Sequence, residues 1–409
     1  MRAHYTLSVL VLVVGCSSRI VSLTDGAPPP RSDGGCEIGV TVQPIQQFAC
    51  SDVMYSVGAV VAASGHRLVY GARATFGSNS AADLDLFEMQ TDTGAIQQLT
   101  GDDEDSVLLG ADGDAVLFAR REGYKEPYRL FLVRGQQPAL ELGSFAELSF
   151  VAGDDLYAYS PMHAVAAGRA VWRAVDTVYL FDGAKVVKLA TLDKPYGSAP
   201  SLDEQGQVAT WSAGEGSQDH EIYRRVIGGT TVQVTINATD DRHPVASQGR
   251  LFWQCDAGIC MWSPDGGEVQ LDQGTSCSAP DAHRGSAAWI CDGSVRFYDG
   301  KSVRQVVAAS PAVERFGLRL HAGRMVWGES DAKSSPYSMK GTLVLWDGRQ
   351  ARDLAEVGLP CVVCGMYWPP LSLVLTDQLV AWSYAEQLPS AKPPYEHCAY
   401  AGLRQECVE

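Results

Sequence analysis

The cysteines are the first candidates for chemistry in this sequence. The chain has 409 residues and 11 Cys, and Cys361 and Cys364 form a Cys-x-x-Cys pair. A redox role for such a pair requires a helix N-terminus that lowers a thiol pKa, and no helical pattern surrounds this pair. A zinc site requires a second pair at suitable spacing, and the nearest, Cys255 and Cys260, lies far away in the sequence. We therefore favour structural disulfides over redox or metal chemistry here.

Cys16 stands apart from the other cysteines because of what precedes it. A basic start at Arg2, an apolar stretch over 7–14 and small residues before a cleavage point predict a signal peptide over 1–15. The segment Val13-Val14-Gly15-Cys16 resembles the lipobox of bacterial lipoproteins. That resemblance implies a lipidated Cys16 as the new N-terminus and, with Ser17 after it, favours the outer membrane. We expect an exported protein, periplasmic or surface-exposed, that the lipid alone attaches to the membrane.

The other ten cysteines are an even number in an exported chain, which is typical of disulfides. Cys255 and Cys260 flank a tight turn that would bring them to bridging distance, and Cys277 is the expected partner of Cys291. The remaining six are Cys36 and Cys50, paired by proximity, Cys398 and Cys407, also paired by proximity, and Cys361 and Cys364. Connectivity stays open, because sequence alone does not determine it.

Histidine and acidic residues offer weaker candidates. His283 and His321 each stand six residues before a Trp, in equivalent places of a repeat. Two such His could share a metal, but we favour turn residues and expect no metal site. The acidic runs at 102–105 and 240–243 lack the alternating spacing of calcium loops, so we interpret them as solvated turns. There is no nucleophile elbow, P-loop or zincin motif, and no cofactor is expected.

A repeat organises these residues from position 45 to the end, after a Pro- and Gly-rich tether over 16–44. Its anchor is a turn followed by apolar residues that end in an aromatic, at 65–70, 113–118, 168–172, 206–211, 249–253, 285–289, 323–327 and 377–382. Strand-like runs ending in Asp-Gly follow at 178–183, 295–300 and 343–348, and Asp-Gly is a hairpin signal. Such a period predicts an all-β protein that is a single β-propeller. We expect eight four-stranded blades, with seven plus a closing strand as the alternative.

The repeat resembles the WD40-like repeats of TolB-type propellers, best over Pro200 to Gly206 leading into Trp211. The resemblance implies architecture and not activity. Six anchor Trp are expected in the core, at 172, 211, 253, 289, 327 and 382. Trp262 and Trp346 are expected between blades, and Trp368 has no place in the repeat.

The net charge of −16 argues against nucleic acid as a partner, because phosphate binding needs basic surface. The loops between second and third strands are long only in the last two and first two blades, and these blades are neighbours in a closed ring. We expect one binding rim there, at Tyr124, Tyr337, Tyr367, Trp368 and Tyr395. The favoured function is a non-catalytic binding or scaffold module for a protein or glycan; the alternative is a propeller enzyme such as a polysaccharide lyase or hydrolase. An enzyme would need carboxylates, His or Arg converging at the ring centre, whereas the first strands are mostly small and apolar.

Overall fold

The computed structural model describes most of the repeat region and two short N-terminal strands. The described residues are 38–41, 49–51, 61–73, 84–101, 104–121, 126–145, 151–152, 160–161, 163–174, 176–192, 200–214, 219–256, 258–332, 340–358, 373–377, 379–386, 396–401 and 404–407. All regular elements within them are β-strands. No helix in this part of the chain has the length and apolarity to cross a membrane.

Seven blades each consist of four consecutive antiparallel strands. Blade 1 is β3 (Val61–Ser64), β4 (Arg67–Arg73), β5 (Leu84–Gln90) and β6 (Ile96–Gln98). Blade 2 is β7 (Asp105–Asp112), β8 (Ala115–Arg121), β9 (Tyr128–Arg134) and β10 (Leu140–Phe145). Blade 3 is β13 (His163–Ala166), β14 (Arg169–Ala174), β15 (Thr177–Phe181) and β16 (Val186–Thr191). Blade 4 is β17 (Ser201–Leu202), β18 (Val208–Gly214), β19 (His220–Val226) and β20 (Thr231–Gln233).

The second half of the ring continues the same order. Blade 5 is β21 (Arg242–Ser247), β22 (Arg250–Cys255), β23 (Gly258–Ser263) and β24 (Gly267–Gln273). Blade 6 is β25 (Asp281–His283), β26 (Ser286–Cys291), β27 (Ser294–Tyr298) and β28 (Val303–Val307). Blade 7 is β29 (Val313–His321), β30 (Arg324–Asp331), β31 (Lys340–Trp346) and β32 (Ala351–Gly358). A short hairpin, β11 (Val151–Ala152) with β12 (Ser160–Pro161), lies between blades 2 and 3 in the chain.

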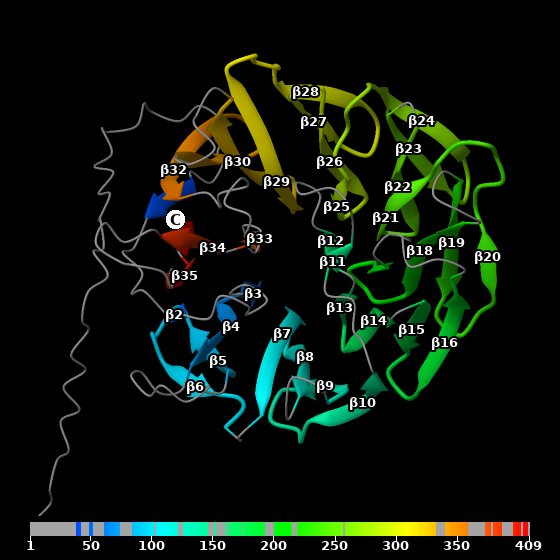
Figure 1. The fold of residues 1–409 in the computed structure, drawn as a ribbon. Helices are drawn as coiled ribbons and strands as arrows, with labels where there is room; N and C mark the ends of the chain where they lie inside the picture. The colour runs from blue at the N-terminus through cyan, green and yellow to red at the C-terminus, as the bar shows by residue number, and fades with distance from the viewer. Residues whose placement is uncertain are drawn as a thin grey trace, which may run out of the picture.

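A further four-stranded sheet, the closing sheet, completes the ring from both ends of the chain. It adds the N-terminal β2 (Ala49–Ser51) to β33 (Leu373–Leu375), β34 (Val380–Glu386) and β35 (Glu396–Ala401). Each innermost strand contacts the innermost strand of the next sheet, and β33 contacts β3, so the ring is closed (Figure 1). The expected single all-β propeller with four-stranded blades is confirmed. Seven blades are continuous in the chain, as in the alternative count, and the closing sheet follows them.

The two ends of the described chain also pair a second time. β1 (Ile38–Thr41) pairs with β36 (Arg404–Cys407), so residues assigned to the tether from sequence include a strand. In the closing sheet, Cys50 is the register partner of Cys398. The ladder therefore makes Cys50 and Cys398 cross-strand neighbours, whereas proximity in sequence had paired each with a different cysteine.

The anchor residues form the core because they lie on the second strand, between two neighbouring sheets. The Trp side chains of blades 3 to 7, at 172, 211, 253, 289 and 327, are at most 1% exposed. Between blades 6 and 7, Phe297 packs on Trp346 with ring centres 5.2 Å apart, and Arg224 of blade 4 lies over Trp262 of blade 5. The expected core and inter-blade roles of these Trp are confirmed.

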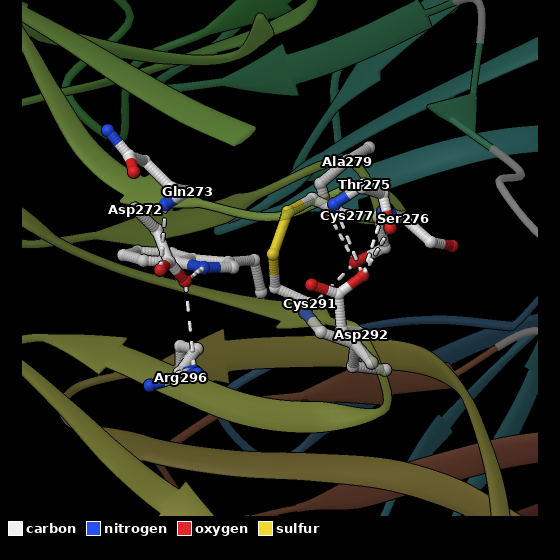
Figure 2. The surroundings of a disulfide bond; sticks show 12 residues. Asp272, Gln273, Thr275, Ser276, Cys277, Ala279, Cys291, Asp292 and Arg296 are labelled. Atoms are coloured by element: carbon white, nitrogen blue, oxygen red, sulfur yellow. Dashed lines mark hydrogen bonds and ion pairs between the residues drawn. A yellow bond between two sulfur atoms is a disulfide. The ribbon is translucent and has the colours of Figure 1, made fainter. Parts of the chain in front are cut away.

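Two disulfides reinforce blades 5 and 6. One joins Cys255 to Cys260 across the β22–β23 hairpin, and the other joins Cys277 to Cys291, as the sequence analysis had paired them. Figure 2 shows the second bridge beside Asp292, whose carboxylate accepts the backbone N–H groups of Thr275 at 3.2 Å and Ser276 at 3.0 Å. The bridge and this carboxylate together hold the segment that leads into blade 6.

Candidate functional site

The rim expected from sequence lies outside the described residues. This applies to the whole aromatic set and to the lipidation site: Cys16, Tyr124, Tyr337, Tyr367, Trp368 and Tyr395. The strands that flank Tyr124, Tyr337 and Tyr395 are second and third strands of their sheets, which agrees with the strand order used to define that rim. Cys36, Cys361 and Cys364 also lie outside the described part of the chain.

The opposite face carries the turns between first and second strands, and a repeated hydrogen bond links them around the ring. In four blades the last residue of the first strand accepts a backbone N–H from the equivalent turn of the next blade. The pairs are Ser64 Oγ with Gly113 N at 2.8 Å, Asp112 Oδ2 with Ala167 N at 2.7 Å, Ser247 Oγ with Gly285 N at 2.8 Å, and His283 Nδ1 with Ala322 N at 2.9 Å. We call this contact the turn link.

An arginine at the start of the second strand makes a parallel link. Its guanidinium donates to a backbone carbonyl in the next sheet's turn: Arg67 to Gly113 at 3.2 Å, Arg169 to Gly206 at 3.3 Å, Arg250 to Gly285 at 3.0 Å and Arg324 to Asp377 at 3.1 Å. Thr376 Oγ1 lies 3.5 Å from the Gly65 carbonyl and joins the closing sheet to blade 1. These bonds hold the turns in a fixed ring on one face of the propeller.

Titratable side chains gather on this face between blade 4 and the closing sheet. The rings of His283 and His321 stack with their centres 4.0 Å apart. His321 Nε2 lies 3.2 Å from Asp377 Oδ1, and Arg284 Nη2 lies 3.7 Å from the other oxygen of Asp377. We call Glu204, His283, Arg284, His321 and Asp377 the mouth cluster.

Glu204 joins this cluster from a more distant blade. Its Oε1 accepts the Ser247 hydroxyl at 2.8 Å and the backbone N–H of Arg284 at 2.6 Å. Its Oε2 is buried and has no hydrogen-bond partner among the described residues. One carboxylate from blade 4 therefore orients turns of blades 5 and 6.

Burial sets the charge state of the two imidazoles. It is the main cause that lowers the pKa of His283, and it lowers the pKa of His321 to about 4, with the neighbouring His283 adding to the effect. Both rings are therefore neutral near pH 7. Because Nδ1 of His283 accepts a backbone N–H, its proton is on Nε2; because Nε2 of His321 lies against a carboxylate, its proton is there and Nδ1 is an acceptor.

Opposite charges balance at the solvent side of the cluster. The side chains of Arg284 and Asp377 are 59% and 51% exposed, and Arg324 lies 3.5 Å from Asp377. Asp281 is partly buried and accepts the backbone N–H of Leu320 at 2.8 Å, and desolvation raises the pKa of its carboxyl group. The accessible groups are thus two arginines, carboxylates and two neutral imidazoles.

The sequence predicts part of this site. The spacing places His283 and His321 at equivalent positions of neighbouring blades, and the structure brings them together, but as the last residues of β25 and β29 and not as the expected turn residues. We did not expect Glu204 and Asp377, although each stands at a turn before an anchor and that position was a usable signal. We also expected no convergence of carboxylates, His and Arg at the ring centre, because we considered the first strands rather than the turns that end them.

The acidic run at 240–243 is corrected. Asp241 is fully buried and accepts the indole N–H of Trp253 at 2.8 Å, and burial raises the pKa of Asp241 to about 6. Asp240 binds His220 Nδ1 at 2.7 Å. These carboxylates are structural and not solvated turn residues.

Metal binding receives no support from the described residues, in which no group of three or more His, Cys, Asp or Glu is placed to hold an ion.

Comparisons with known proteins give likenesses to solved structures alone. No family model and no curated protein matches the chain. Among solved structures, it is similar to a puromycin hydrolase (15% identity, TM-score 0.43), covering 86% of this chain and 63% of that one, so it spans less than two thirds of that enzyme. It is also similar to the propeller domain of the Trilobed protease from Pyrococcus furiosus (10% identity, TM-score 0.45, 78% and 98% covered). An oligogalacturonate lyase in complex with manganese is similar as well (12% identity, TM-score 0.49, 82% and 98% covered). These likenesses extend to the propeller fold and no further.

Proposed function

We propose that this protein is an exported, lipid-anchored binding module of the cell envelope, and that the mouth cluster is its ligand site. The lipobox-like segment that ends at Cys16 supports export and lipid anchoring. The observation that carries the binding site is the convergence of Glu204, the two stacked imidazoles, Arg284 and Asp377 from four sheets at one mouth of a rigid ring. Function concentrates in turns that a rigid scaffold positions.

Binding is favoured over catalysis by the acid–base properties of the cluster. A general acid or base works best with a pKa near the operating pH. The pKa of His321, about 4, leaves that ring deprotonated and weakly basic. These features suit hydrogen bonding to a ligand better than proton transfer.

Two experiments test this proposal, one for membrane attachment and one for the ligand site. Cys16→Ser should release the chain from the membrane fraction of a bacterial host and remove acyl mass from the N-terminal peptide. The purified mature chain is then screened against arrays of glycans and envelope proteins. Any ligand found should lose binding to an Arg284→Ala/Asp377→Ala variant and keep binding to the exposed control Lys301→Ala. A ligand that binds the double variant as tightly as the wild type would refute the mouth cluster as the site.

A propeller lyase or hydrolase is the second candidate, because the neutral imidazoles and carboxylates converge as an enzyme would require. Product analysis after prolonged incubation with each bound ligand separates the two. Cleavage that disappears in His321→Asn would establish the enzyme.

A further inference from the structure

We infer that the ligand of the mouth cluster is an uncharged, hydroxyl-bearing carbohydrate, with the His283–His321 stack as its hydroxyl-binding pair. This inference rests on the proposed function and names the chemical class that the site would take. It depends on three independent observations: the hydrogen-bonding state of the two rings, their comparison with other blades, and the charge of their surroundings.

The two rings together offer one donor and one acceptor. Nδ1 of His283 is occupied by the Ala322 backbone N–H, so its Nε2–H is the remaining donor. Nε2 of His321 is occupied by Asp377, so its Nδ1 is the remaining acceptor. Neither remaining nitrogen has a partner among the described residues. A hydroxyl group is the common biological group that accepts and donates at once.

The turn link does not require an imidazole, although blade 6 has one at His283. Ser64 and Ser247 make the same turn link at 2.8 Å in blades 1 and 5, and Asp112 makes it at 2.7 Å in blade 2. A small acceptor therefore suffices to join neighbouring blades. The additional ring atoms of His283 serve the stack with His321, which has no counterpart in those three links.

The surroundings favour an uncharged ligand. Asp377 is opposed by the guanidinium groups of Arg284 and Arg324, Glu204 accepts the backbone N–H of Arg284, and both imidazoles are neutral. An anionic sugar would meet two carboxylates as well as two guanidinium groups, in a chain of net charge −16. Mixed donors and acceptors without strong net charge match hydroxyl groups, which can satisfy both kinds.

The deciding variant is His283→Asn. The Asn Oδ1 stands where Nδ1 of the imidazole was, so it retains the turn link and removes the ring. Asp112→Asn in blade 2 is the matched control, because it also keeps an acceptor at a turn link but lies outside the mouth cluster. Thermal unfolding of both variants should be close to that of the wild type.

Binding of the mature chain is measured by calorimetry with neutral gluco-, manno-, xylo- and N-acetylglucosamine oligosaccharides, and with oligogalacturonate as the charged comparison. At least one neutral oligosaccharide should bind, and its affinity should fall roughly tenfold or more in His283→Asn, while Asp112→Asn binds as the wild type does. Equal affinity in His283→Asn overturns the inference. Binding of only oligogalacturonate, or only of an envelope protein through Arg284 and Asp377, overturns it and leaves the proposed function intact. No ligand at all in either screen overturns both.

Discussion

The turns of blades 5 and 6 perform the same structural task with different side chains. Ser247 and His283 both end an innermost strand, and each accepts a backbone N–H from the next blade at nearly the same distance, 2.8 and 2.9 Å. At the turn of blade 5, the serine turn, the Ser247 side chain makes one further hydrogen bond, to Glu204. The histidine turn adds a stacked ring and an exposed arginine at the neighbouring position. The shared turn link joins neighbouring blades, whereas the extra imidazole and arginine are groups that a ligand could contact.

Arg250→Ala should have the largest effect on stability, because Arg250 links the serine turn to the histidine turn. Its guanidinium donates to the Gly285 carbonyl at 3.0 Å, and a hydrogen bond from a charged donor is worth about 2 kcal/mol. We expect a fall of about that size in the free energy of unfolding, measured by denaturant titration. Lys301→Ala, at an exposed position of blade 6, should change it by less than about 0.5 kcal/mol. Equal effects of the two changes would mean that the arginine link is dispensable.

Ser247→Ala should cost about 1.5 kcal/mol, and Ser64→Ala about 1 kcal/mol. Both remove a turn link, but Ser247 also donates to Glu204, so its loss removes a second hydrogen bond. Comparing the two unfolding midpoints shows how much Glu204 contributes to the ring. If Ser64→Ala proved the more destabilising, the role given to Glu204 would be wrong.

The histidine turn, unlike the serine turn, should also make stability depend on pH. The pKa of His321 is about 4 in the folded chain, below the ordinary value of about 6.5 that it regains on unfolding. Between these values the unfolded chain binds more protons, so stability falls as pH falls from about 6.5 to 4. Asp241 acts in the opposite direction, because its pKa is raised to about 6 and its protonated form is favoured in the folded state.

The contribution of His321 therefore appears as a difference between two proteins. Unfolding free energies of the wild type and His321→Asn are measured from pH 7 to pH 4. The variant should lose less stability on acidification, whereas Ser247→Ala should run parallel to the wild type. Parallel curves for His321→Asn would show that burial does not suppress protonation of this ring.

The fold could be predicted from the repeat, because each Trp anchor marks a second strand and each turn before it marks the end of a first strand. Equivalence between His283 and His321 followed from the same spacing. Contacts between turns did not follow, because periodicity gives positions within a blade and not distances between blades. Glu204 meets the backbone of Arg284 from two blades away, and that contact exists only because the ring brings the turns together at its centre.

The closing sheet also has a mechanical meaning. β2 is held by three register pairs with β35, and β3 of blade 1 follows it in the chain. Tension applied from the N-terminal side would act first on the β1–β36 ladder and then on the β2–β35 pairs before it reached blade 1. Detachment of β2 would leave β35 as an unpaired edge, which invites strands of other chains. The N-terminal strand of the closing sheet would therefore link any load on the proposed anchor to the sheet that completes the ring.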